Sequence, residues 1–375
     1  MRKTQFNPRH LVITMRTFTV SFVAAVFAAT VANFPVSSEN SQPQQARCTA
    51  EQGQRHIDQG RYEQAIREFT CVIDQDPTAV EGYRGRIEAA LLLGRYSDAL
   101  GDYARVTANV LPVHPDARAT ILSGYAARLA VAPDDITALM GASFARWSDF
   151  EYLQTIHLLN HLLEVEPNNV FGNLFRGSSR LLKGVTGDKG VADIERALGL
   201  ASQSADVRFI VADAYTYGLS DPERAFVEAS FALDEGLDTP RVHAILATSY
   251  HAFGDDESAS VHLLRHFELV TTELVPTAPL APNTSVKLTL APGRVYEIPV
   301  LVVAGETLGI TTSSRDYWDS IAVLLAPDGT PVTGSDDENA YFAAFEWVAK
   351  ATATYRLRVT FFESVNSGEL IVVRD

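Results

Sequence analysis

The sequence predicts a multidomain protein, an all-α solenoid of helix pairs followed by an all-β sandwich. The phrase GRYEQAIREF at 60–69 recurs as GRYSDALGDY at 94–103, thirty-four residues later. An interval near 34 is typical of helix pairs that stack as repeats. Beyond residue 284 the apolar residues alternate with a period of two, in short runs separated by turn sequences. That second pattern is typical of β-strands.

The first residues of the chain have a different composition. Residues 1–32 contain four Arg or Lys and no acid, and the apolar run TFTVSFVAAVFAATVA fills 17–32. A basic segment followed by an apolar run and small residues predicts a secretory signal peptide; an uncleaved anchor is the alternative. We expect a polar linker at 33–45 and an exported mature chain that is periplasmic, on the cell surface or secreted. We expect no membrane span once the signal is cleaved.

The helical part is expected at 46–273 as six units, placed at 46–79, 80–113, 136–169, 170–204, 206–239 and 240–273. Residues 107–135 are a degenerate repeat or a spacer. Small residues recur where two helices of a unit would cross: Gly53, Ser143, Gly177 and Ala247 in the first helix, and Ala65, Ala99, Ala225 and Ala259 in the second. Gly60, Gly94 and Gly254 stand where a left-handed turn residue would join the two helices. These residues resemble the tetratricopeptide repeat (TPR), in which stacked units form a solenoid.

The TPR resemblance implies a concave groove lined by the first helix of each unit. Carried over residue by residue, the groove would be lined by Arg84, Glu88, Met140, Phe144, Trp147, Leu174, Leu181, Ile210 and Tyr217. This set is largely apolar and aromatic, so the expected partner is a protein or peptide with an apolar segment or an amphipathic helix. The Lys and Asn with which some TPR domains bind acidic C-termini are missing here. The alternative is that the stripe belongs to the core or is covered by the rest of the chain.

The chain has two cysteines, Cys48 and Cys71. Two cysteines in an exported protein are the number needed for one disulfide. In the TPR register Cys48 falls near the start of the first helix and Cys71 near the end of the second, and antiparallel helices bring those ends together. Two unpaired thiols are the alternative.

Histidines recur at i, i+4 on two helices, as HLLNH at 157–161 and HLLRH at 262–266. The spacing places two imidazoles on one helical face, but the Glu of a zinc-hydrolase motif is missing. We expect ordinary helix histidines.

The strand part is expected at 285–375, after a Pro-rich linker at 274–284. The segments Ala304–Glu306, APDGT at 326–330, ATYRLRV at 353–359 and SGELIV at 367–372 resemble the bacterial pre-peptidase C-terminal (PPC) domain. The resemblance implies a jelly-roll-like sandwich with an accessory role, which is to bind a substrate or a surface polymer or to aid secretion. Some members bind calcium, and the densest carboxylates here are Asp319, Asp336 and Asp337; a solvated acidic turn is the alternative. We expect no other cofactor.

No catalytic motif or phosphate-binding loop is evident in the sequence. The net charge of −15 argues against nucleic acid as a partner. The leading hypothesis is therefore an exported, non-catalytic scaffold that binds a protein or peptide segment in the groove of the solenoid. The alternative is a secreted accessory protein whose sandwich binds an extracellular polymer or surface, with the repeats as a spacer.

Overall fold

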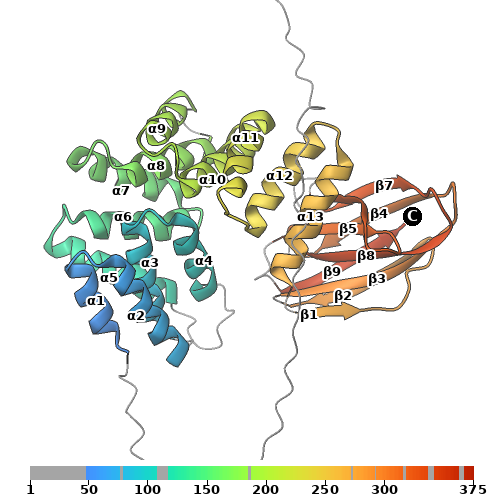
Figure 1. Ribbon diagram of the computed structural model, residues 1–375, viewed down its shortest axis with the longest axis horizontal. Helices are drawn as coiled ribbons and strands as arrows, with labels where there is room; N and C mark the ends of the chain where they lie inside the picture. Colours follow the sequence, from blue (N-terminus) through green and yellow to red (C-terminus); the bar gives the residue numbers. More distant parts are fainter. Residues whose placement is uncertain are drawn as a thin grey trace, which may run out of the picture. The chain divides into compact units, whose positions relative to one another are not determined.

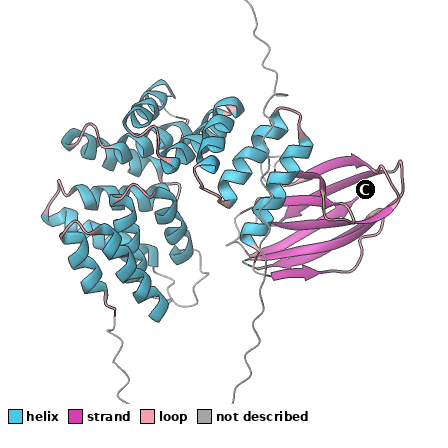
Figure 2. Ribbon diagram, in the orientation of Figure 1, coloured by secondary structure: helices cyan, strands magenta, loops and turns pink. Residues whose placement is uncertain are grey.

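The computed structural model describes residues 48–76, 79–107, 117–184, 187–271, 273–291, 293–315, 318–336, 342–362 and 367–375. The predicted signal peptide and polar linker lie outside these residues. The described chain is helical up to Val270 and made of strands from Glu273 onward, which confirms the predicted fold class (Figure 2). None of the described helices has the length and apolarity needed to cross a membrane.

The six predicted helix pairs are all present (Figure 1). They are α1 (Ala50–Asp58) with α2 (Tyr62–Gln75), α3 (Val80–Leu92) with α4 (Tyr96–Thr107), α6 (Ile136–Trp147) with α7 (Tyr152–Val165), α8 (Val170–Leu182) with α9 (Gly187–Leu200), α10 (Ala205–Ala214) and its π-helical continuation η2 (Tyr215–Leu219) with α11 (Pro222–Asp234), and α12 (Pro240–Ala252) with α13 (Asp256–Val270). Between the second and third pairs the described residues contain the helix α5 (Ala117–Val131), and residues 108–116 lie outside the described part of the chain.

Small residues let the paired helices approach closely. A Cβ on Gly53 of α1 would lie 2.6 Å from the ring of Phe69 of α2, and a Cβ on Gly85 of α3 would lie 2.1 Å from the same ring. The Phe69 ring thus fills the space between the first helices of two successive units. Gly60 and Gly94 have φ of +68° and +73° in the turns between helices, as predicted. Glycine adopts this conformation without the steric cost of a Cβ.

The strand part is a sandwich of two sheets. Its strands are β1 (Glu273–Pro276), β2 (Thr284–Leu290), β3 (Arg294–Val302), β4 (Thr307–Ser314), β5 (Ser320–Leu325), β6 (Pro331–Ser335), β7 (Ala344–Val348), β8 (Ala353–Phe361) and β9 (Gly368–Arg374). One sheet has the order β1-β3-β8-β5-β6 and the other β2-β9-β4-β7. Two details differ from the prediction. Strand β1 lies at the start of the predicted linker and pairs with β3, and β6 was not predicted.

The last helix pair packs against the first of these sheets. Leu263 and Phe267 of α13 share an apolar cluster with Ile321 and Val323 of β5. All six residues of β5 are buried, because the sandwich core covers one face of the strand and α13 lies on the other. Gly334 of β6 permits the approach, since a Cβ there would lie 3.1 Å from a methyl group of Leu263. The face of this sheet that points away from the sandwich core is therefore covered by α13.

Candidate functional site: a polar hollow between three helices

A polar hollow of about 350 Å³ lies between α1, α3 and α5. Each helix contributes two lining residues: Gln54 and Asp58 from α1, Arg84 and Glu88 from α3, and Tyr125 and Arg128 from α5. The pairs on α1 and α3 are four residues apart and so lie on one face of their helix. Two of the nine predicted groove residues, Arg84 and Glu88, are brought together here.

Glycines let α5 form one wall of the hollow. The ring of Tyr125 packs over Gly141 of α6, where a Cβ would lie 2.1 Å from the ring. The Arg84 guanidinium lies beside Gly124, where a Cβ would be 2.8 Å from Nη1. The 34-residue period does not predict this wall, because α5 lies outside the six repeat units. The run ILSGYAARLAV at 121–131 is the signal that could have indicated a helix.

Ion pairs fix two of the charged side chains in place. Arg128 donates from Nη1 to Glu88 Oε1 at 3.1 Å and from Nε to Asp135 Oδ2 at 2.9 Å. Asp135 also caps α6 by accepting a hydrogen bond from the Ala138 amide at 3.0 Å. Glu88 is only 4% exposed. Burial raises the pKa of the Glu88 carboxyl, and the neighbouring Arg128 acts in the opposite direction.

Two polar groups of the hollow are left without a partner. Within the described part of the chain, Arg84 makes no ion pair or hydrogen bond, and the buried Tyr125 hydroxyl makes no hydrogen bond. Burial raises the pKa of Tyr125 well above its usual value, so the phenol is neutral and able to donate. Buried polar groups are normally hydrogen-bonded. The Arg84 guanidinium therefore lines the hollow as a cation that acts on Glu88 through its charge, whereas the Tyr125 hydroxyl is buried against Gly141.

A second hollow provides a comparison. It measures about 480 Å³ and is lined by residues of α7, α8 and α9 that include Arg176, Asp193 and Arg196. Arg176 pairs with Asp193 at 2.7 Å, and Arg196 donates to Asn168 at 2.6 Å. Its cations thus already have partners within the chain. The hollow between α1, α3 and α5 is the stronger candidate for a binding site.

The apolar residues predicted for the groove are placed in the core. Met140, Phe144, Trp147, Leu174, Leu181 and Ile210 are each at most 7% exposed. Helix α4 covers part of this set. The Tyr103 ring lies edge-on to Phe144 with centroids 6.0 Å apart, and Tyr96 lies 5.6 Å from the ring of Phe175 on α8. The structure thus corrects the expectation of an open apolar groove in favour of the alternative, a core stripe. Tyr217, the ninth residue, is 37% exposed and lies under the Arg241 guanidinium.

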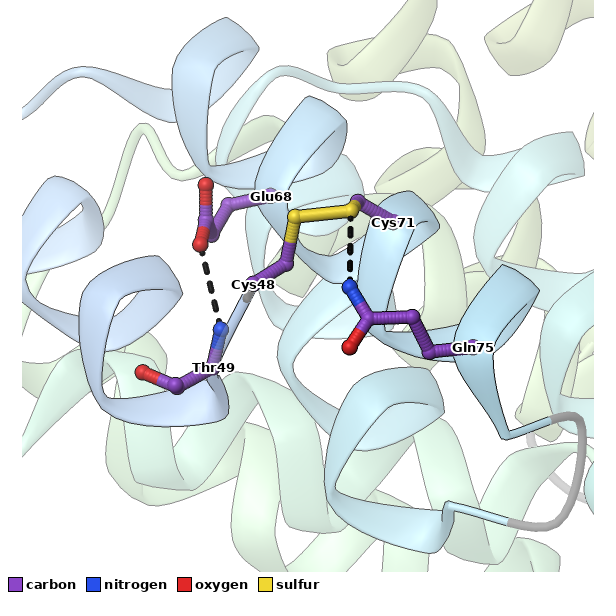
Figure 3. Close-up of a disulfide and its surroundings, with 5 residues drawn as sticks. All are labelled: Cys48, Thr49, Glu68, Cys71 and Gln75. Carbon is purple, nitrogen blue, oxygen red and sulfur yellow. Dashed lines mark hydrogen bonds between the residues drawn. A yellow bond between two sulfur atoms is a disulfide. The ribbon is translucent and has the colours of Figure 1, made fainter. Parts of the chain in front are cut away.

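The bond expected between Cys48 and Cys71 is present in the structure, with Cα atoms 5.9 Å apart (Figure 3). It joins the segment before α1 to the C-terminal half of α2. Next to it the Thr49 amide donates to Glu68 Oε1 at 3.1 Å, and Gln75 Nε2 lies 3.2 Å from the Cys71 sulfur. The disulfide restrains the first of the described units, which packs against α3 of the next unit.

Two of the acidic residues considered for calcium, Asp319 and Asp336, lie in the described part of the sandwich. Asp336 is buried and accepts a hydrogen bond from Thr248 of α12 at 3.4 Å, so it lies at the contact between helices and sandwich. The Asp319 carbonyl accepts the amide of Phe362 at 2.9 Å. Asp337 lies outside the described residues. Among the described residues no three His, Cys, Asp or Glu side chains are grouped to hold a metal ion.

Histidines form a buried network in the last helix pair. His243 Nδ1 and His262 Nδ1 are 2.8 Å apart, and His243 Nε2 lies 2.8 Å from Asp238 Oδ1. His266 Nδ1 donates to the Pro240 carbonyl at 2.9 Å, and its ring lies 5.4 Å from Phe362 of the sandwich. Burial lowers the pKa of both His262 and His266 to about 4. The HLLRH motif is therefore a packing element, as expected, placed next to the sandwich.

Comparisons with known proteins find similarities in both the helical part and the strand part of the chain. A model of the bacterial transcriptional activator domain matches residues 25–118. A tetratricopeptide repeat protein from Parabacteroides merdae aligns at 15% identity and a TM-score of 0.36, over 60% of this chain and 78% of that one. The TPR protein TTC0263 from Thermus thermophilus aligns at 19% identity and a TM-score of 0.32, over 54% of this chain and 97% of that one.

The strand part has its own match. The pre-peptidase C-terminal domain of a Bacillus anthracis collagenase aligns at 17% identity and a TM-score of 0.23, over 28% of this chain and 95% of that domain. Comparison with curated proteins finds no match. Both resemblances stated from the sequence, TPR and PPC, thus recur among the solved structures, and they concern the fold.

Proposed function

We propose that this protein is an exported, non-catalytic scaffold that binds a segment of a partner protein in the hollow between α1, α3 and α5. The observation that carries the proposal is the Arg84 guanidinium, which lines the hollow and makes no ion pair or hydrogen bond among the described residues. A stacked repeat protein presents extended surfaces of this kind to partners. The hollow occupies part of the face that the TPR resemblance assigned to ligands.

The chemistry of the hollow changes the expected partner. Six of the seven apolar or aromatic residues that the sequence assigns to the groove are buried, whereas the hollow is lined mainly by charged and polar side chains. The partner segment is therefore anchored by a polar group, and apolar contacts are secondary. The Cys48–Cys71 disulfide supports export, because disulfides persist in oxidising compartments.

The test is a pull-down from envelope and culture-supernatant extracts with residues 33–375 as bait, read by mass spectrometry. Arg84→Glu should abolish recovery of the specific partner, because it places a carboxylate where the ligand binds. Arg67→Glu on α2, an exposed arginine outside the hollow, is the matched control. Equal recovery with both variants would contradict the proposal. Truncation at residue 273 is unsuitable as a bait, because it would uncover Leu263 and Phe267.

The sandwich is the second candidate for the binding surface. Leu301, Val303 and Val348 are exposed on it, and the Gly305 amide bonded to the Ala349 carbonyl at 2.8 Å brings their two segments together. If a polymer or surface partner is lost with Leu301→Ser and Val303→Ser but retained with Arg84→Glu, recognition lies in the sandwich. That outcome would make the repeats a spacer.

A further inference from the structure

We infer that two copies of this chain associate through the edge of the sandwich, by pairing their β7 strands antiparallel about a two-fold axis at Val348. The four-stranded sheets of the two copies would then join into one continuous sheet. The inference concerns the sandwich alone, so it goes beyond the proposed function and is independent of the hollow.

The sheet edges of the sandwich differ in how they are protected. Unpaired backbone groups on an edge strand can pair with another chain, and proteins commonly block them with prolines, covering contacts or short strands. The four-residue strand β1 ends at Pro276, and β6 begins at Pro331 and packs against α13. On β2 the Thr289 carbonyl already accepts a hydrogen bond from the Tyr296 hydroxyl at 2.5 Å. Strand β7 is also the last of its sheet, but it contains no proline and no such contact among the described residues (Figure 1).

The hydrogen-bond pattern of β7 shows which of its backbone groups are free. Antiparallel strands exchange hydrogen bonds at every second residue. Directly after β7 the Ala349 amide donates to the Glu306 carbonyl at 2.9 Å, so the odd-numbered residues of β7 bond to β4. The even-numbered residues therefore direct their amides and carbonyls away from β4, and these groups have no partner among the described residues. They are Ala344, Glu346 and Val348.

The side chains along this edge are complementary to a second copy of themselves. Val348 is 56% exposed, and Glu346 and Lys350 on either side of it are exposed and make no ion pair with another described residue. If two β7 strands run antiparallel with Val348 opposite itself, Glu346 of each copy lies opposite Lys350 of the other. Opposite charges then meet twice, with an apolar contact on the axis. Cross-strand pairs of both kinds are stabilising, and a two-fold contact requires this self-complementarity.

Charge and side-chain size favour this register over its neighbour. Pairing centred on Glu346 would place two carboxylates opposite each other, which is unfavourable. With Val348 on the axis, Trp347 of one copy lies opposite Ala349 of the other, and the small residue leaves room for the indole. The rings of Phe345 and Trp347 are only half-buried at the rim of the sandwich core. A second strand would cover them, so apolar burial adds to the backbone hydrogen bonds.

The experiment is sedimentation equilibrium of residues 33–375 over a range of protein concentrations, with hydrogen exchange of the β7 amides. We expect a reversible dimer, and the Val348 amide should become protected as the dimer forms. Glu346→Lys should weaken the dimer roughly tenfold or more, because the like-charged pair that it creates occurs twice. Lys350→Glu should have the same effect. The double variant Glu346→Lys with Lys350→Glu should restore the dimer, because it exchanges the two charges.

Val348→Pro tests the backbone pairing separately. Proline removes the amide at the free edge of β7 and no hydrogen bond to β4, so the dimer should be lost while thermal stability is kept. Ser285→Pro is the matched control, because it removes an amide at the free edge of β2; this variant should dimerise normally. If proline perturbs the sheet, the charge variants still decide the question.

Three results would overturn the inference. They are a chain that stays monomeric up to about 1 mM, a dimer that both Val348→Pro and Glu346→Lys leave intact, and a double variant that associates no better than the single variants. A fourth result would also reject self-pairing. If the chain is monomeric and a protein recovered from extracts is lost with Val348→Pro, the edge of β7 binds a strand of another protein instead.

Discussion

The two ends of the solenoid are completed by different chemistry. At the N-terminal end the first helix pair is closed by the Cys48–Cys71 disulfide. At the C-terminal end the last pair is covered by a β-sheet, through Leu263 and Phe267. A terminal repeat lacks one neighbour and needs some other means of protecting its exposed face. One end therefore uses a covalent restraint on the unfolded chain, and the other uses apolar burial against a second domain.

This difference predicts separate sensitivities. Reductant should affect the first helix pair and leave the last one intact. Acid and changes in apolar volume should act most strongly at the last pair, where buried histidines adjoin the sandwich. The hollow lies near the disulfide end, between α1, α3 and α5. Binding there should thus depend on the disulfide more than on the sandwich.

The largest effect is expected from Phe267→Ala at the sandwich contact. Phe267 is fully buried, and truncation of a buried Phe to Ala typically costs about 3–5 kcal/mol. Hydrogen exchange should show loss of protection in α12, α13 and β5, with α1 and α2 unchanged. The control is Val261→Ala on the same helix, because Val261 is 52% exposed. An equal loss of protection at both ends would mean that the molecule unfolds as one unit.

The next effect is expected from replacing both cysteines with Ala. The bond joins residues 23 apart in sequence, and closing a loop of this length is worth about 3 kcal/mol in the chain-entropy model. The free energy of urea unfolding, followed at α1 and α2, should be lower in the variant by this amount. Reductant should then have no further effect on the variant. Unchanged stability in the variant would mean that Thr49, Glu68 and packing against α3 suffice to hold the first pair.

Acid should weaken the last helix pair. Folding lowers the pKa of His262 and His266 from 6.5 to about 4, in both cases mainly by burial. A depressed histidine pKa means that the fold favours the neutral ring. The stabilisation is therefore complete above pH 6.5 and is lost progressively as the pH falls toward 4. Thermal unfolding between pH 7.5 and 4.5 should show this loss, and His266→Phe should reduce its slope. If the stability of His266→Phe falls with pH as steeply as that of the unmodified protein, His266 does not cause the acid sensitivity.

The series of helix pairs could be predicted from the sequence because each pair is specified by local sequence features. A 34-residue period, small residues at helix crossings and glycines in turns are each read from the chain directly. Phe69 between Gly53 and Gly85 shows the mechanism, since one large ring requires two small partners. The strands followed from their alternation in the same way, except for the edge strands β1 and β6.

The site could be predicted only in part, because it depends on which helices meet. Arg84 and Glu88 were assigned to a ligand-facing surface, and they line the hollow. The identity of their neighbours depends on α5, a helix outside the repeat. Phe144 and Trp147 have the same helical spacing as groove residues, but packing with Tyr103 and Phe175 buries them. Spacing defines a face of a helix, whereas exposure of that face is a tertiary property.

The smallest predicted effect compares the turns along the solenoid. Gly60 in the first unit and Gly254 in the last have φ of +68° and +75°, whereas the third unit places Phe150 at +61°. A bulky residue in this region is strained, and Phe150 is 68% exposed, so its ring recovers little of that cost by burial. Phe150→Gly should therefore stabilise the protein by up to about 1 kcal/mol.

Gly60→Ala and Gly254→Ala provide the converse test, since each introduces a Cβ where the backbone is left-handed and should cost about 1 kcal/mol. Thermal unfolding measures all three variants. The local backbone rule is the same at both ends, so the two glycine variants should respond alike even though the ends are completed differently. If Phe150→Gly destabilises the protein instead, the edge-on contact between Phe150 and Tyr152 at 6.2 Å outweighs the strain. The third turn would then be held by a side-chain contact that the glycine turns lack.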